Sequence, residues 1–197
     1  MKRWSWLWLL CSALWLNAAA LAEPLFQHGE VPRPGLGGAL TLTDQQGHSF
    51  SLKQLKGQPA LLFFGFSRCA TVCPVALFQA KQLLALFQSR RAPTVIFISL
   101  DPLSDDPASL AKFLAPFDRR IVGLTGSPAQ IEQAAARYGV AMQGQGANIE
   151  HSARWYLVGA DAQVLRVYDS ATSANLLAQD IVRMQNATNF GRFKEFL

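Results

Sequence analysis

The sequence has 197 residues, of which half are hydrophobic and 16% are charged. This length and composition fit one globular domain with a substantial core and exclude an intrinsically disordered chain. The formal net charge is +5, but the cations are scattered and no basic patch is interleaved with aromatic residues, so nucleic-acid binding is not predicted.

The first 22 residues have the layout of a secretory signal. Lys2 and Arg3 precede an apolar stretch from Trp4 to Leu16, and Ala20–Ala22 forms an A-x-A cleavage site before Glu23. The alternative is an uncleaved N-terminal membrane anchor, because the apolar segment is just long enough to cross a bilayer. Either interpretation exports the rest of the chain, to the periplasm or the outer face of the bacterial inner membrane.

After the leader, a linker arm rich in Pro and Gly is predicted at 23–38, followed by a single domain at 39–197. Alternating apolar residues on either side of Asp44–Gly47 predict a hairpin at the start of the domain. The apolar run at 59–66 then predicts a buried strand, and the stripe of apolar residues after it predicts a helix that starts at Pro74.

The rest of the domain alternates strands with helices. The predicted elements are a strand at 94–100, a helix at 106–114, a strand at 121–126, a helix at 127–138, a hairpin at 154–169 and a last helix over Ala174–Met184. This alternation predicts an α/β fold in which helices flank a central mixed sheet that begins with an N-terminal β-hairpin.

Cys69 and Cys73 are the two cysteines outside the leader, which contains Cys11. A disulfide between them would close so short a loop that it would remove little entropy from the unfolded chain, so a chemical role is favoured. If the pair spans a helix start, the two Cα atoms lie about 6 Å apart on one face, which suits a disulfide or one shared metal ion. The positive helix end and Arg68 would favour thiolate, which is both a redox nucleophile and a soft ligand, so both chemistries stay open.

Three histidines follow the leader. His28, in the arm, and His48, beside the first turn, are expected to be exposed to solvent. His151 ends a Gly-rich loop that, in a thioredoxin-type topology, faces the helix with the cysteines. This loop, residues 143–154, lacks the proline that ordinary thiol exchangers carry there. Two thiolates and one imidazole suit Cu(I), and Cu(II) with an added ligand, better than zinc.

Five stretches of the sequence resemble the Sco/SenC family of copper-binding, thioredoxin-like assembly factors for cytochrome c oxidase. They are "LTDQQG", "LLFFGFSRCATVCPVAL", "ISLDPLSDDPASLAKFL", "GLTGSPAQIEQAAARYGV" and "EHSARWYLV", and the resemblance runs from about residue 38 to residue 182. The family usually reads Cys-Pro-Asp-Val-Cys-Pro and Asp-His-Ser, whereas this chain has Ala70, Thr71 and Glu150 at the differing positions.

The resemblance implies a copper metallochaperone, rather than an enzyme, that binds copper through Cys69, Cys73 and His151. It would deliver the ion to subunit II of cytochrome c oxidase, meeting the membrane through that partner or through its own anchor. The alternative function is a thiol-disulfide reductase, in which Cys69 attacks and Cys73 resolves, that keeps copper-ligand cysteines of a respiratory enzyme reduced. Asp101 is expected to form a turn or a helix cap rather than to support the site, and Met142 and Met184 are expected to be loop and core residues rather than soft ligands.

Overall fold

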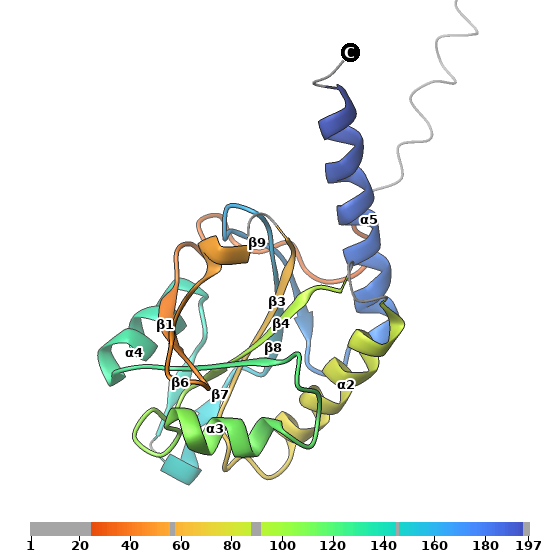
Figure 1. Ribbon diagram of the computed structural model, residues 1–197. Coiled ribbons are helices and arrows are strands. Elements are labelled where there is room, and N and C mark those ends of the chain that lie inside the picture. The colour runs from red at the N-terminus through yellow and green to blue at the C-terminus, as the bar shows by residue number, and fades with distance from the viewer. Residues whose placement is uncertain (1–24, 56–57, 88–91, 145, 195–197) are drawn as a thin grey trace, which may run out of the picture.

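The computed structural model describes residues 25–55, 58–87, 92–144 and 146–194. The predicted leader, residues 1–22, lies outside these ranges. Within them, no helix combines the length and the hydropathy needed to cross a membrane. The chain forms a central sheet with helices against both of its faces (Figure 1).

Seven strands form the central sheet in the order β2-β1-β5-β4-β3-β8-β9. They are β1 (Thr41–Asp44), β2 (Ser49–Ser51), β3 (Ala60–Gly65), β4 (Thr94–Ser99), β5 (Val122–Thr125), β8 (Arg154–Val158) and β9 (Val164–Asp169). β3 pairs in parallel with β4 and antiparallel with β8, while β1 and β2 form a hairpin. The predicted mixed sheet with an N-terminal hairpin is therefore confirmed.

The remaining elements cover the sheet or extend from its edge. The helices are η1 (Leu52–Leu55), α2 (Val72–Leu86), α3 (Pro107–Leu114), α4 (Pro128–Arg137), η2 (Gly146–Asn148) and α5 (Ala174–Lys194). β6 (Met142–Gln143) and β7 (Glu150–His151) form a second sheet of two strands, called the β6–β7 ribbon below.

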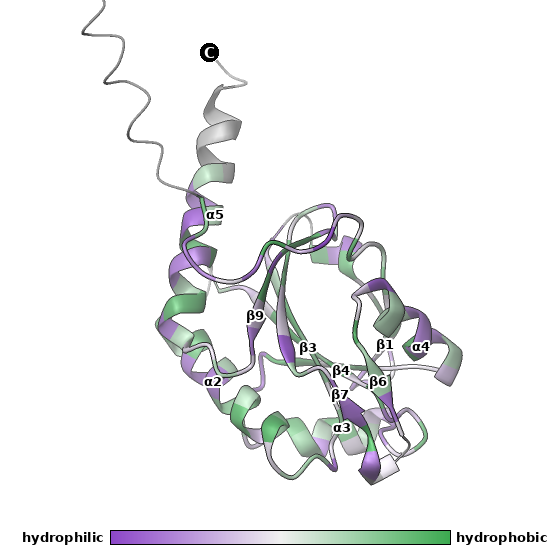
Figure 2. Cartoon of the chain, turned by 180° about the vertical axis from the view of Figure 1, so that it is seen from behind, coloured by the Kyte–Doolittle hydropathy of each residue, from purple (hydrophilic) through white to green (hydrophobic). Residues whose placement is uncertain are grey.

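The central sheet separates two hydrophobic cores. Along β3, Leu62 and Phe64 face the core under α4, whereas Leu61 and Phe63 face the core under α2 and α5. Side chains alternate between the two faces of a strand, so a strand between two cores must be apolar at every position. Figure 2 shows this hydrophobic colouring along the inner strands.

Two helices differ from their predicted bounds. α2 begins at Val72, two residues before Pro74, and α5 continues to Lys194 rather than ending at Met184. The apolar stripe that ends at Met184 predicts only the part of α5 that packs against the core. Backbone hydrogen bonds within a helix do not require such a stripe, so the helix can extend past it.

Residues 25–38, predicted as a linker arm, lie along β9 and α5. Two isolated β-bridges join this segment to the chain at positions 163 and 167. The buried carboxylate of Asp180 accepts hydrogen bonds from the backbone N–H groups of Gln27 and His28, at 2.9 and 3.1 Å. Because the segment makes these contacts through its backbone, no periodic pattern of apolar side chains predicts them from the sequence.

Candidate metal centre

The candidate site begins where β3 ends. A Cβ atom added at Gly65, the last residue of β3, would lie 2.6 Å from Sγ of Cys73 and 2.9 Å from the Phe97 ring. Glycine is therefore required here for the sulfur to approach the strand. A turn follows, in which the N–H of Cys69 donates to the carbonyl oxygen of Phe66 at 3.2 Å, and α2 starts directly after it.

Cys69 and Cys73 lie together at the start of α2 as free thiols. Cys73 is fully buried beneath the helix, whereas Cys69 is partly exposed in the turn that precedes it. The two side chains lie close enough for each to shift the pKa of the other. The structure therefore confirms that the pair lies across the start of a helix.

The two thiols differ in acidity. Partial burial raises the pKa of Cys69, but hydrogen bonds from backbone N–H groups at the start of α2 and from Cys73 outweigh it, so the pKa lies below its ordinary value. Thr71, the N-cap of α2, makes no side-chain cap bond, which leaves these N–H groups to the sulfur. Burial raises the pKa of Cys73 well above its ordinary range. Cys69 is thus the more acidic thiol and Cys73 its protonated, buried partner.

A buried carboxylate that the sequence analysis missed holds the cysteine turn in place. Asp105 is fully buried and accepts hydrogen bonds from the backbone N–H of Ser67 at 2.9 Å and from the Ser67 hydroxyl. It also accepts one from the Ser99 hydroxyl at 2.6 Å. The carboxylate thereby joins the turn before α2 to the end of β4, and it contributes to the raised pKa of Cys73, after burial as the main cause.

Arg68, expected to favour thiolate, is paired with a carboxylate. Its guanidinium donates to the carboxylate of Asp101 at 2.5 Å. The main chain of Asp101 forms a turn, as predicted, because its carbonyl oxygen accepts from the N–H groups of Ser104 and Asp105. Among the groups that lower the pKa of Cys69, the backbone N–H donors at the start of α2 contribute most.

His151 lies on the β6–β7 ribbon. Its ring centroid is 6.0 Å from that of Phe66, the residue that starts the cysteine turn. Burial lowers the pKa of His151 below its ordinary value, so the imidazole is neutral at neutral pH. Nδ1 lies 3.3 Å from the carbonyl oxygen of Ser152, and with Nδ1 as donor the lone pair on Nε2 is free for a ligand.

The loop inside the ribbon also contacts the cysteine turn. A Cβ atom added at Gly146 would lie 2.9 Å from a guanidinium nitrogen of Arg68. Arg68 therefore lies between the cysteine turn, the Asp101 carboxylate and the loop that leads to His151. Within the described ranges, however, no group of three or more His, Cys, Asp or Glu side chains is close enough to hold a metal ion. The structure brings the cysteines together but does not bring His151 into coordination with them.

The other two histidines lie elsewhere. The side chain of His48 is 78% exposed beside Asp44, as expected for a turn residue. His28 is half-buried, and its Nε2 lies 3.3 Å from Oε1 of Gln179 on α5. Neither histidine is a candidate for the site.

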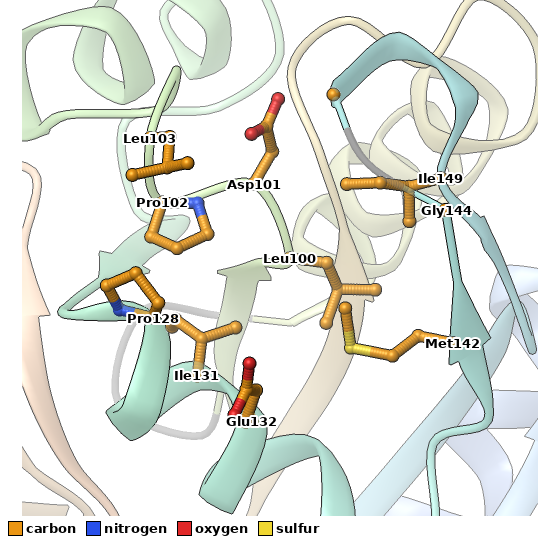
Figure 3. Close-up of a pocket in the computed structure, with 11 residues that line it drawn as sticks. Leu100, Asp101, Pro102, Leu103, Pro128, Ile131, Glu132, Met142, Gly144 and Ile149 are labelled. Carbon is orange, nitrogen blue, oxygen red and sulfur yellow. The ribbon is translucent and has the colours of Figure 1, made fainter.

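A pocket of about 180 Å³ opens beside the site (Figure 3). Leu100, Ile131 and Ile149 form its apolar wall, and Met142 of the ribbon points toward them (Figure 3). Asp101, the partner of Arg68, lies at the same opening. The pocket is thus built from the same segments that hold Arg68 and His151.

A family model described as SCO1/SenC matches residues 29–186. The chain belongs to this family. Among curated relatives, protein SCO1 of Saccharomyces cerevisiae mitochondria is 31% identical over 176 residues, which cover 83% of this chain and 60% of that protein. The human SCO1 homologue is 32% identical over 144 residues, 68% of this chain and 48% of that protein. The chain thus spans about half to three fifths of these two relatives.

Solved structures give the same result. Bradyrhizobium japonicum ScoI with copper bound is 34% identical, with a TM-score of 0.68 over 75% of this chain and 98% of that chain. Yeast Sco1 with copper bound is 30% identical, with a TM-score of 0.67 over 76% of this chain and 87% of that chain. These neighbours confirm the predicted thioredoxin-like fold, while the ligand roles of Cys69, Cys73 and His151 stay predictions.

Proposed function

We propose that this protein is a copper metallochaperone that binds Cu(I) through Cys69, Cys73 and His151 and delivers it during assembly of cytochrome c oxidase. The observation that carries the proposal is the pair of unequal sulfurs at the start of α2. Soft sulfur with one imidazole is the ligand set that suits Cu(I). The copper-bound relatives from Bradyrhizobium and yeast support the same choice of cargo.

Each residue has a separate task in this account. Cys69 offers a thiolate, and Cys73 releases its proton to solvent as Cu(I) binds, because only the deprotonated sulfur is a ligand. His151 is neutral and needs to lose no proton before it coordinates. Because His151 is not in coordination with the sulfurs in the structure, the β6–β7 ribbon has to move toward the cysteine turn to complete the site.

Delivery would occur by ligand exchange, in which the acceptor's ligands replace those of the chaperone one at a time. Copper remains Cu(I) throughout, so no electron donor is needed. The proposed acceptor is the copper site of subunit II of cytochrome c oxidase. The corresponding location is the periplasm or the outer face of the bacterial inner membrane, reached as a secreted protein or through an N-terminal anchor.

A Cu(I) titration under anaerobic conditions, read out with a competing chromogenic chelator, tests the ligand set. Loss of an outer-shell partner typically costs about 10- to 100-fold in metal affinity, so His151→Ala should cost at least that much. His48→Ala is the matched control, since His48 is exposed and lies in the turn of the β1–β2 hairpin at the edge of the central sheet. Equal affinity in the two variants would remove His151 from the proposal.

The unequal acidity of the two thiols also favours a second candidate function, that of a thiol-disulfide reductase. The Cys69 thiolate would attack a partner disulfide and release one partner thiolate. Cys73, after losing its proton, would then attack Sγ of Cys69 and release the second, leaving a Cys69–Cys73 disulfide. Two electrons pass from the protein to its partner. Reduction of a disulfide-bonded subunit II peptide by the copper-free protein, abolished in Cys73→Ser, would support this role.

A further inference from the structure

Met142 lies directly opposite His151 in the β6–β7 ribbon. The N–H of Ser152 donates to the carbonyl oxygen of Ala141 at 3.0 Å. Ala141 and Ser152 are therefore a hydrogen-bonded pair of the antiparallel ladder. The next pair along an antiparallel ladder is then the close, non-hydrogen-bonded kind, with Cα atoms about 4.5 Å apart. Residues paired in this way place their side chains on the same face. The side chains of Met142 and His151 therefore extend from the same face of the ribbon, from adjacent positions on its two strands.

The surroundings of Met142 differ from those of an ordinary core methionine. Met184, on α5, is buried within the core, with an exposed fraction of 7%. Met142 is only half-buried and lies at the rim of the pocket in Figure 3. It also lines, with His151, a more open hollow of about 360 Å³ on the ribbon. Met142 is thus reachable from solvent, beside a proposed copper ligand.

The chemistry of this pair matches the proposed cargo. Thioether sulfur is a soft ligand that selects Cu(I), and imidazole also binds copper. A thioether carries no proton at any pH, and imidazole binds copper in its neutral form. Neither side chain therefore has to lose a proton before it binds Cu(I). Two such ligands hold Cu(I) less firmly than two thiolates do.

We propose that Met142 and His151 form a second, weaker Cu(I) site on the β6–β7 ribbon, through which the ion passes between the cysteines and solvent-side ligands. This inference rests on the proposed copper function. It also replaces the sequence-based expectation that Met142 is a plain loop residue. Because both ligands lie on one short ribbon outside the main sheet, they would approach and leave the cysteine turn together.

The passage is a ligand exchange in which no electron moves. Cu(I) keeps its bond to Nε2 of His151 and exchanges the two thiolates for the thioether sulfur, and Cys73 takes up a proton from solvent as its bond to copper breaks. Cys73 is fully buried, so the incoming ligand has to come from the side of the partly exposed Cys69. This is the side on which Phe66 and the His151 ring lie.

Methionine methyl NMR on the full chain, titrated anaerobically with Cu(I), tests the inference. The chain has three methionines, and Met142→Leu and Met184→Leu assign the two signals of the domain. In the double variant Cys69→Ser with Cys73→Ser, we expect the Met142 methyl signal to shift with Cu(I) while that of Met184 stays unchanged. Adding His151→Ala should abolish the shift.

Transfer kinetics provide the second measurement. With Cu(I) loaded on the otherwise unchanged protein, Met142→Leu should slow transfer to a chelator several-fold, while Met184→Leu should not. If the Met142 signal does not move, or the transfer rate is unaffected, the inference is wrong even though copper binds at the cysteines. If the unchanged protein binds no Cu(I), the proposed function itself fails.

Discussion

Cys69 and Cys73 lie on the main body of the fold, at the junction of a central strand and a helix that is buried along one side. His151 and Met142 lie on the β6–β7 ribbon, which pairs outside the seven-stranded sheet. The first region is fixed by Gly65, by the carboxylate of Asp105 and by two cores. The second region touches the first through Phe66 and Arg68.

This difference suits a protein that must both hold and release an ion. A preorganised sulfur pair lowers the ordering cost of binding, which favours affinity. A ligand on a short, separate ribbon can open with little loss of overall stability, because local opening costs less than global unfolding. The cysteine junction would then set how tightly copper is held, and the ribbon would set how quickly it leaves.

The largest effect is expected from Asp105→Ala, which should disrupt the cysteine junction. Ser67 and Ser99 would lose their buried acceptor. Because buried donors without a partner are costly, we expect the free energy of unfolding to fall by about 3 kcal/mol. Urea denaturation measures it. The neighbouring Asp106 is exposed and caps α3, so Asp106→Ala should cost less. Equal losses would mean that Asp105 does not hold the turn.

Gly65→Ala should have the next largest effect, through the sulfur itself. The new methyl group would lie 2.6 Å from Sγ of Cys73, and overpacking of this kind costs about 1–3 kcal/mol. We expect reduced stability together with weaker Cu(I) binding, measured by denaturation and chelator competition.

Gly159→Ala is the matched control for this change. Its added Cβ would lie 3.1 Å from the movable end of the Leu165 side chain, which can give way. Copper affinity should therefore be unaffected. If Gly65→Ala also leaves copper affinity unchanged, Cys73 is not a ligand whose position matters.

The cysteine junction could be predicted largely from the sequence, because its causes are local. An apolar run that stops at Gly65, a Cys-x3-Cys spacing and a proline in the first helical turn are enough to place two sulfurs at a helix start. The role of Asp105 could not be predicted in this way. The sequence marks Asp106, before Pro107, as the start of a helix, but it does not show that Asp105 is buried, because that depends on the turn that Asp101 forms.

The ribbon could be predicted only in part, because its causes are not local. The position of His151 depends on a loop in which Gly144 and Gly146 adopt positive φ angles of 85° and 61°. Two-residue strands carry too little hydrophobic pattern to be recognised. The pairing of Met142 with His151, and hence the proximity of two soft ligands, is visible only in the fold.

The difference in acidity between the two thiols gives a prediction of intermediate size. Because the pKa of Cys69 is lowered, its thiolate fraction persists to lower pH than in the unfolded chain. Iodoacetamide should therefore modify Cys69 in Cys73→Ser at neutral pH faster in the native state than in urea. Cys73 in Cys69→Ser should react slowly until high pH, because burial raises its pKa. Equal rates for the two thiols would contradict the assignment of Cys69 as the thiolate.

The smallest change in copper affinity, but an informative one, is expected from Arg68→Gln at the contact between the two regions. The Arg68 side chain is 46% exposed but that of Asp101 is only 6% exposed, so the substitution removes the partner of a buried carboxylate and should cost about 1–3 kcal/mol in the free energy of unfolding. The guanidinium also contacts the ribbon loop at Gly146, so its loss should free the ribbon. We therefore expect a modest loss of stability together with faster transfer of Cu(I) to a chelator.

Arg154→Gln separates these two effects. Arg154 is 41% exposed and pairs at 2.7 Å with Glu30, which is itself 71% exposed, so this variant also loses an arginine ion pair while the ribbon contact of Arg68 is untouched. Faster transfer in Arg68→Gln but not in Arg154→Gln would locate the control of copper release at the contact with the ribbon. Equal transfer rates would instead place that control at the sulfurs, because removing the contact would then leave release unchanged.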